Sequence, residues 1–292
     1  MNPGIVTVRP FQLDDLDAAA RFCEAARALD PSIEPFSQRL SVIATGTRAA
    51  LKLWQVAAGE DEQIHGIAFA ALRDSDAQST YDFYTAVHPA LRRQGLGRAL
   101  AEPAVASGAI LRARVRDDSR PGLAFLNSFG FIETGAQLSL QWKARERPEA
   151  QPMPALRIRP AAARDAGTLT RLSKDAWAGA PDTYASRADE IAQLFGEEGR
   201  VALLAESEAK PLGYLAGVQL GRTLGIEEVA VLPEFRRMGI GRALVVHALR
   251  NEQGAVLSVS EANKPARALY KALGFVQSAR RIVLELRPAE PA

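Results

Sequence analysis

The chain has 292 residues, which exceeds the usual size of one compact domain and suits two domains of roughly 140 residues each. Its 36 basic and 34 acidic residues leave a net charge of +2, too balanced to indicate binding to nucleic acid or to a membrane surface. The single cysteine, Cys23, excludes an internal disulfide and a cysteine-rich metal site. No signal peptide and no membrane-spanning apolar run are visible, so we expect a cytoplasmic protein that needs no metal.

A basic, glycine-containing phrase occurs twice. RRQGLGRAL (92–100) and RRMGIGRAL (236–244) agree at seven of nine positions. SFGF and ALGF, further along each half, are also 144 residues apart, whereas Asp15 and Asp165 near the start of each half are 150 apart. Such self-similarity predicts two similarly folded domains. We expect an N-terminal domain at 1–143, an extended, proline-containing linker at 144–154 and a C-terminal domain at 155–292.

The expected elements alternate between strands and helices along both halves. The first half has a helix after the opening RP, then strands at 51–56, 65–72 and 84–87, and a helix at the repeated phrase that Pro103 should end or kink. The second half has, in order, a strand at 156–159, helices at 165–176 and 184–195, strands at 200–207, 211–220 and 224–232, the motif helix, a strand at 255–260, a helix at 264–273 and a strand at 281–286. Each domain is therefore predicted to be α/β, with one mixed, mainly antiparallel sheet flanked by helices.

The second copy of the phrase has the properties of a pyrophosphate-binding loop. It follows a β-type run and leads into a helix, whose first backbone N–H groups lie unpaired at the positive end of the helix dipole. Gly239 and Gly241 would let a ligand approach the backbone, and Arg236, Arg237 and Arg242 add positive charge. The alternative is a solvated basic helix start in which the glycines serve only the turn.

The order of motifs resembles that of the GNAT superfamily of acyl-CoA-dependent N-acyltransferases. R-x-x-G-x-G at 236–241 is followed, after a strand, by N-x-x-A-x-x-x-Y-x-x-x-G-F from Asn263 to Phe275. The resemblance implies an acetyl-CoA-dependent N-acetyltransferase with a small-molecule or peptide amine as acceptor. It also implies that coenzyme A is held by Val229, Val231, Arg236, Arg237, Met238, Gly239, Ile240, Gly241, Arg242 and Asn263.

Three residues of the second half are candidates for the chemistry. The resemblance places Tyr270 near the thioester sulfur, as the acid for the departing thiolate; the alternative is a core tyrosine. Glu227 or Glu228 would take the proton of the amine, and strict alternation along a strand would send the two side chains to opposite faces. We favour Glu227, although a solvated acidic pair at the start of the strand is the alternative.

The first half retains the loop but not the candidate chemistry. Arg92, Gly95 and Gly97 match the second half, so this loop is also a candidate CoA site. Leu126 stands where the second half has Tyr270, and the two glutamates are replaced by Phe83 and Tyr84. We therefore expect a structural or regulatory domain. A site rebuilt from Tyr81, Asp82 and Tyr84 is the alternative.

Other functions remain open at this point. One is a non-catalytic acyl-CoA-binding sensor, and another is nucleic-acid binding through the arginine pairs, against which the balanced charge counts. A third is an acetyltransferase resembling mycothiol synthase, another tandem protein, whose acceptor is the amine of a cysteinyl pseudodisaccharide. Trp177, Asp182 and Tyr184 lie in the region that shapes the acceptor pocket of the resembling family. The oligomeric state is left undetermined.

Overall fold

The computed structural model describes residues 5–33, 53–74, 80–143, 147–149, 153–178, 186 and 188–288, apart from the side chains of Arg73 and Asp74. The chain forms two compact units. Unit 1 contains residues 1–135 and 281–292, and unit 2 contains residues 136–280.

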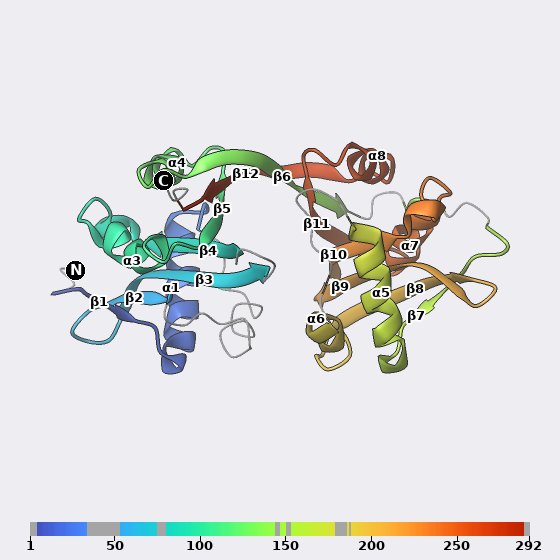
Figure 1. Ribbon diagram of the computed structural model, residues 1–292, viewed down its shortest axis with the longest axis horizontal. Helices are drawn as coiled ribbons and strands as arrows, with labels where there is room; N and C mark the ends of the chain where they lie inside the picture. The colour runs from blue at the N-terminus through green and yellow to red at the C-terminus, as the bar shows by residue number, and fades with distance from the viewer. Residues whose placement is uncertain are drawn as a thin grey trace. The chain divides into compact units, whose positions relative to one another are not determined.

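The elements follow the expected order in both halves (Figure 1). The first half contains β1 (Thr7–Pro10), α1 (Leu16–Leu29), β2 (Gln55–Ala58), β3 (Ile64–Asp74), β4 (Thr80–Val87), α3 (Leu96–Val105), β5 (Ile110–Arg116), α4 (Arg120–Asn127) and β6 (Ile132–Lys143). The second half contains β7 (Arg157–Pro160), α5 (Ala166–Trp177), α6 (Ala188–Gln193), β8 (Arg200–Ser207), β9 (Lys210–Leu220), β10 (Thr223–Val231), α7 (Ile240–Ala248), β11 (Gly254–Ser260), α8 (Lys264–Ala272) and β12 (Val276–Leu286).

Each unit has one mixed sheet. In unit 1 the strand order is β1-β2-β3-β4-β5-β12, and in unit 2 it is β7-β8-β9-β10-β11-β6. The pairs β4–β5 and β10–β11 are parallel, and the neighbouring pairs are antiparallel. The predicted fold class, mainly antiparallel α/β with flanking helices, is confirmed.

Each sheet is completed by a strand from the other half of the sequence. The end of β6, from Gln137 to Lys143, pairs with β11 in unit 2. Reciprocally, the end of β12, from Arg281 to Leu286, pairs with β5 in unit 1. The structural division therefore differs from the contiguous one predicted from the sequence, because the last strand of each repeat begins in one unit and ends in the other.

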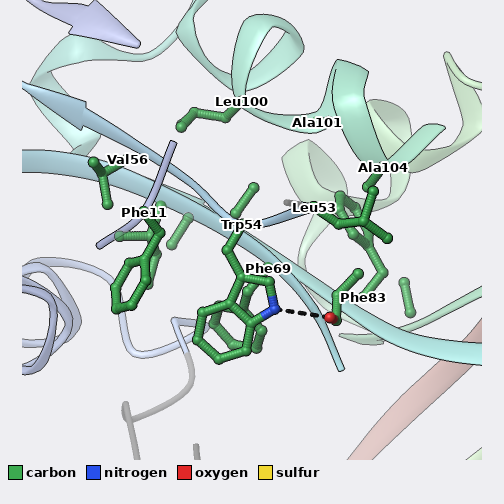
Figure 2. Close-up of a cluster of buried hydrophobic side chains, with 14 of the residues drawn as sticks. Phe11, Leu53, Trp54, Val56, Phe69, Phe83, Leu100, Ala101 and Ala104 are labelled. Atoms are coloured by element: carbon green, nitrogen blue, oxygen red, sulfur yellow. Dashed lines mark hydrogen bonds between the residues drawn. The ribbon is translucent and has the colours of Figure 1, made fainter. Parts of the chain in front are cut away.

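Unit 1 is built around an aromatic core. The rings of Phe11, Trp54 and Phe69 contact one another in sequence, with centroids 5.2 and 5.0 Å apart, and the indole of Trp54 donates a hydrogen bond to the Ala70 carbonyl (Figure 2). Leu100 of α3 and Ala26 of α1 belong to the same buried cluster. Ring–ring contacts of this kind stabilise the core beyond what apolar burial alone provides.

Unit 2 has separate cores on the two faces of its sheet. Leu203 and Leu215 pack with α7 and α8, whereas their neighbours Leu204 and Tyr214 pack with α5 and α6. This alternation follows from the two-residue period of a strand. Figure 1 shows α5 lying across the strands β8 to β10.

Two local expectations were wrong in the first half. The helix α3 continues for two residues past Pro103 and, with 10 residues, is no shorter than the nine-residue α7. Pro103 removes the N–H that would donate to the Ala99 carbonyl, but the helix continues to Val105. The strand predicted at 51–56 begins only at Gln55, since Leu53 lies in a short helical turn.

Candidate active site

The loop before α7 has a backbone conformation that few sequences adopt. Arg237 and Gly239 both have positive φ, +65° and +87°. The loop before α3 repeats this geometry at Arg93 and Gly95, with φ of +66° and +85°. The glycine in each loop is the N-cap of its helix. The repeated phrase therefore specifies one turn, used twice, in which the glycine occupies a left-handed conformation that disfavours other residues.

This turn leaves a run of backbone amides free. Over the described part of the chain, none of the backbone N–H groups from Arg237 to Arg242 donates a hydrogen bond to another residue. The Nε of Arg242, in the first turn of α7, is also buried without a partner among the described residues. Adjacent unpaired N–H groups at a helix N-terminus form an anion-binding site. Met238, Gly239, Ile240 and Gly241, here called the cradle, lie in this turn and in the first turn of α7, and their binding of coenzyme A stays a prediction.

The first arginine of each phrase has intramolecular partners. Arg236 donates to the carbonyl of Val231, 3.2 Å away, and to that of Ala176 near the end of α5. Arg92 donates to the carbonyl of Val87 and forms a 2.6 Å ion pair with Asp30 at the end of α1. Both guanidinium groups therefore tie the loop to the preceding strand and to the first helix, whereas Arg237 is exposed.

The residues between the two repeats lie along α7. The guanidinium of Arg147 donates to the carbonyls of Leu249, Arg250 and Glu252 after the end of α7, and the Glu149 carbonyl accepts from Arg242 at its start. The sulfur of Met153 lies 3.6 Å from the position that a Cβ on Gly239 would occupy. Of the described residues of this segment, Arg147 therefore contacts the C-terminal end of α7, Glu149 its start, and Met153 the region beside Gly239.

The strand before the cradle separates from its parallel neighbour. The pairing of β10 with β11 covers Thr223–Ile226 and Gly254–Leu257 and stops there, although β10 continues to Val231 and β11 to Ser260. Val229 and Val231 lie in the separated part, with side chains packed on the α7 face. Beyond Ile226, the edge of β10 that faced β11 is thus no longer paired with it, while the other edge stays paired with β9 up to Val231, shortly before the cradle.

A β-bulge lies where the strands separate. Ile226 pairs with Gly217 and Glu228 with Ala216, so Glu227 is an extra residue in β10. Strict alternation along β10 was therefore the wrong expectation, because a bulge changes which face the following side chains occupy. The carboxylate of Glu227 accepts two hydrogen bonds from Arg200 of β8, at 2.7 and 3.3 Å, and is engaged in an ion pair.

Glu228 projects instead towards α5, where three side chains hold its carboxylate. Ser173 and Trp177 donate to Oε1 at 2.8 and 2.5 Å, and Ser186 donates to Oε2 at 2.7 Å. The fully buried Tyr214 approaches the same groups without reaching hydrogen-bond geometry. Burial, followed by the negative charge of Glu228, raises the pKa of Tyr214 well above its usual range. The structure thus provides a polar, enclosed carboxylate on the α5 side of the sheet.

Helix α8 places the candidate acid on the opposite face. Asn263 is its N-cap, because the Asn263 side chain accepts a hydrogen bond from the Ala266 amide at 3.1 Å. Leu269 lies close to Gly241 in the cradle. Tyr270, the next residue, is buried and packs edge-on against Phe275. Burial raises the pKa of Tyr270 to about 12.

In unit 1 the corresponding positions are filled differently. Tyr84, which corresponds to Glu228, stacks on Phe69 with centroids 4.9 Å apart. Asp82 forms a 2.9 Å ion pair with Arg114. A Cβ on Gly97 would lie only 3.1 Å from the ring of Phe125. Tyr81 and Tyr84 pack against the apolar core of unit 1 and Asp82 pairs with Arg114, and a site rebuilt from these three residues stays a hypothesis.

Sequence reasoning missed Ser173, Ser186 and Arg200. Ser173 could have been found, since it is a polar residue on the buried face of α5, between Leu172 and Ala176. Trp177 was identified as a lining residue, and its indole is found on Glu228. The other two residues expected there, Asp182 and Tyr184, lie outside the described residues.

Other features of the described residues lie away from these groups. An open groove of about 630 Å³ lies at the other end of β10 and β11, lined by Gln141, Trp142, Lys143, Arg147, Arg222, Thr223, Gln253, Gly254, Ala255 and Val256. It contains none of the predicted site residues. Within the described part of the chain, no three His, Cys, Asp or Glu residues are grouped as metal ligands. No helix there is long and apolar enough to cross a bilayer.

Comparison with known proteins agrees with this geometry. The sequence matches the acetyltransferase (GNAT) family over residues 20–131 and 168–275, so the resemblance seen in the sequence is confirmed. A mycothiol acetyltransferase of Thermobifida fusca (strain YX) is 26% identical over 93% of this chain and 94% of its own length. Two solved structures share the fold. A tandem GNAT protein from the clavulanic acid biosynthesis pathway has a TM-score of 0.74 at 17% identity, covering 99% of this chain and 100% of its own. A GCN5-related N-acetyltransferase from Sphaerobacter thermophilus has a TM-score of 0.72 at 18% identity, covering 100% and 98%.

Proposed function

Because the chain belongs to the acetyltransferase (GNAT) family, we propose that it transfers the acetyl group of acetyl-CoA to a primary amine, and that unit 2 performs the transfer. The observation that carries this proposal is the run of backbone amides from Arg237 to Arg242 that have no acceptor among the described residues, directly after the end of the β10–β11 pairing. Such amides at a helix N-terminus, together with the buried Nε of Arg242, which also has no partner in the described part of the chain, suit the diphosphate of coenzyme A. When bound, acetyl-CoA would supply the activated acetyl group as a thioester.

Glu228 is the candidate base of this site. The three side chains that bind its carboxylate are all hydrogen-bond donors, so they orient both carboxylate oxygens as acceptors. In the bulged strand Glu227 is bound by Arg200, so we now favour Glu228 over Glu227 for this role. A carboxylate at the entrance also attracts a cationic amine.

Tyr270 is the candidate hydrogen-bond donor to the leaving sulfur. With a pKa of about 12, its hydroxyl stays protonated at neutral pH. Full proton transfer to a thiolate of ordinary pKa would be about 5 kcal/mol uphill. Tyr270 is therefore expected to stabilise the thiolate by hydrogen bonding, with complete protonation only as the thiol departs.

The acceptor is the least constrained part of this proposal. The name of the Thermobifida fusca relative, mycothiol acetyltransferase, makes the amine of the cysteinyl pseudodisaccharide the first acceptor to test. The polar, anionic surroundings of Glu228 suit a polar amine better than an apolar one. Small polar amines, amino acids, aminoglycoside antibiotics and peptide N-termini complete the panel.

The test is a transfer assay with the whole chain. Acetyl-CoA is mixed with each amine of the panel, release of the free thiol is followed in time, and the acceptor is checked for the mass of one acetyl group. We expect transfer to at least one amine, with one acetyl group gained per thiol released. Tight coenzyme A binding with no transfer to any amine would instead identify a non-catalytic acyl-CoA sensor.

A further inference from the structure

The hydroxyl of Ser173 lies at the centre of the hydrogen bonds around Glu228. Ser173 is fully buried within α5. Its hydroxyl donates to Oε1 of Glu228 at 2.8 Å and accepts the backbone N–H of Ser186 at 2.7 Å. Ser186 in turn donates its own hydroxyl to Oε2 of the same carboxylate at 2.7 Å. Ser173, Ser186 and Glu228 therefore form a closed ring of hydrogen bonds.

This ring determines which part of the carboxylate is available. Among the described residues, Oε1 accepts from both Ser173 and Trp177, and Oε2 accepts from Ser186. A carboxylate has about four acceptor sites, two on each oxygen, so the remaining site is on Oε2. The two hydrogen bonds to Oε1 fix the plane of the carboxylate and so orient the remaining acceptor site on Oε2.

Unit 1 has other side chains at the positions that correspond to Ser173, Trp177 and Glu228. The position 150 residues before Ser173 holds Cys23, which is also fully buried in its helix. By the same offset Arg27 stands in place of Trp177, and Tyr84 replaces Glu228 by the 144-residue offset. A hydroxyl at this position is thus not required to build the helix or its packing. The hydroxyl is present in the unit that has the Glu228 carboxylate and absent in the unit that lacks it.

We propose that Ser173 is a positioning residue, which fixes the Glu228 carboxylate and the backbone at Ser186 relative to each other through one hydroxyl. The orientation of the Glu228 carboxylate then depends on Ser186 being in place. The catalytic consequence rests on the function proposed above for Glu228. The structural consequence, protection of the Ser186 amide, does not.

Hydrogen exchange tests the structural part independently of activity. In the whole chain, Ser173→Ala should accelerate exchange of the Ser186 amide about tenfold or more, because its acceptor is removed. The matched variant Cys23→Ala should leave Ser186 unchanged. Ser173→Cys, which is closer in volume, is the second variant if Ser173→Ala is poorly folded. Unchanged exchange at Ser186 in a folded Ser173 variant would overturn the proposal.

Kinetics test whether Ser173 acts through Glu228. With an amine from the panel that is acetylated, Ser173→Ala should lower kcat/KM for the amine about tenfold and leave the Kd for coenzyme A within about twofold. In a Glu228→Gln background the same substitution should have no further effect, since the group that it orients has lost its role. An additive loss in the double variant would assign Ser173 a purely structural role. Faster exchange at Ser186 without any acetyl transfer would refute the proposed function and leave the positioning role standing.

Discussion

The loops before α3 and α7 have the same backbone conformation, yet their surroundings differ. Both have positive φ at the second arginine and at the first glycine, and both are tied to the preceding strand by the first arginine. In unit 2 the neighbouring face holds Glu228 in a ring of hydrogen bonds, whereas in unit 1 Tyr84 stacks on Phe69. The loop conformation is therefore a property of the repeated fold, and the proposed chemistry would depend on a few side chains present in one copy.

The largest expected effects come from the groups present in unit 2 alone. Glu228→Gln and Tyr270→Phe should each lower kcat/KM by about 10²- to 10³-fold, because proton removal and thiolate stabilisation are lost. The matched variant Tyr84→Phe should stay within about twofold of the unsubstituted chain, since its ring still stacks on Phe69. Initial rates of thiol release give these values. Full activity in Glu228→Gln together with loss in Tyr84→Phe would move the chemistry to unit 1.

The next effect concerns β6 and β12, whose ends each pair with a strand from the other half of the sequence. Leu284 is 2% exposed in the core of unit 1, and Leu140, its counterpart at the 144-residue offset, is 7% exposed in a core of unit 2. Replacing either by alanine should cost about 3 kcal/mol. Hydrogen exchange read unit by unit should show Leu284→Ala weakening α1 and β3, and Leu140→Ala weakening α7 and β11. If each substitution instead weakened helices and strands of its own half of the sequence, the pairing of β6 and β12 with the other half would be contradicted.

These two cases show what the sequence could and could not predict. Strands such as β8 and β9 followed from apolar runs, and the repeated phrase singled out Gly95 and Gly239, which have positive φ in the structure. The exchange of β6 and β12 could not be predicted, because a strand's pattern records its buried face but not its partner. The bulge at Glu227 is a single extra residue and leaves no compositional signal. The role of Ser173 depends on Ser186, 13 residues away, across a stretch with no periodicity.

An arginine–aspartate ion pair with the same geometry occurs in both units, so removing its charge should destabilise either unit. Asp165 accepts two hydrogen bonds from Arg159, at 2.8 and 2.9 Å, and Asp15 accepts two from Arg9 at the same distances. The Arg159 guanidinium lowers the pKa of Asp165 well below its usual range, and the pKa of Asp15 is lowered less because burial opposes the effect of Arg9. A lowered pKa in the folded state stabilises the protein above the unfolded value of about 4, and this contribution is lost as the pH falls below it.

The substitution Asp165→Asn should therefore cost about 2 kcal/mol at pH 7 and reduce the acid sensitivity of unfolding between about pH 4 and pH 2. Asp15→Asn should have the same sign and a smaller size. Urea unfolding at a series of pH values measures both. Equal stability of Asp165→Asn and the unsubstituted chain at pH 7 would show that the ion pair contributes nothing net.

The smallest effect distinguishes the two cradles themselves. Gly95 has open space where a Cβ would lie, whereas at Gly239 the sulfur of Met153 is 3.6 Å from that position. A ligand that binds the amides of unit 2 must share this space with a flexible thioether, which can move at little cost. Met153→Ala should therefore tighten coenzyme A binding to unit 2 by about twofold, well under 1 kcal/mol. Calorimetric titration of Met153→Ala, with Gly95→Val present in both samples to weaken the other cradle, measures this difference. A tenfold loss of affinity would show instead that Met153 contributes to the ligand site. The binding site of unit 2 would then include a residue from between the repeats.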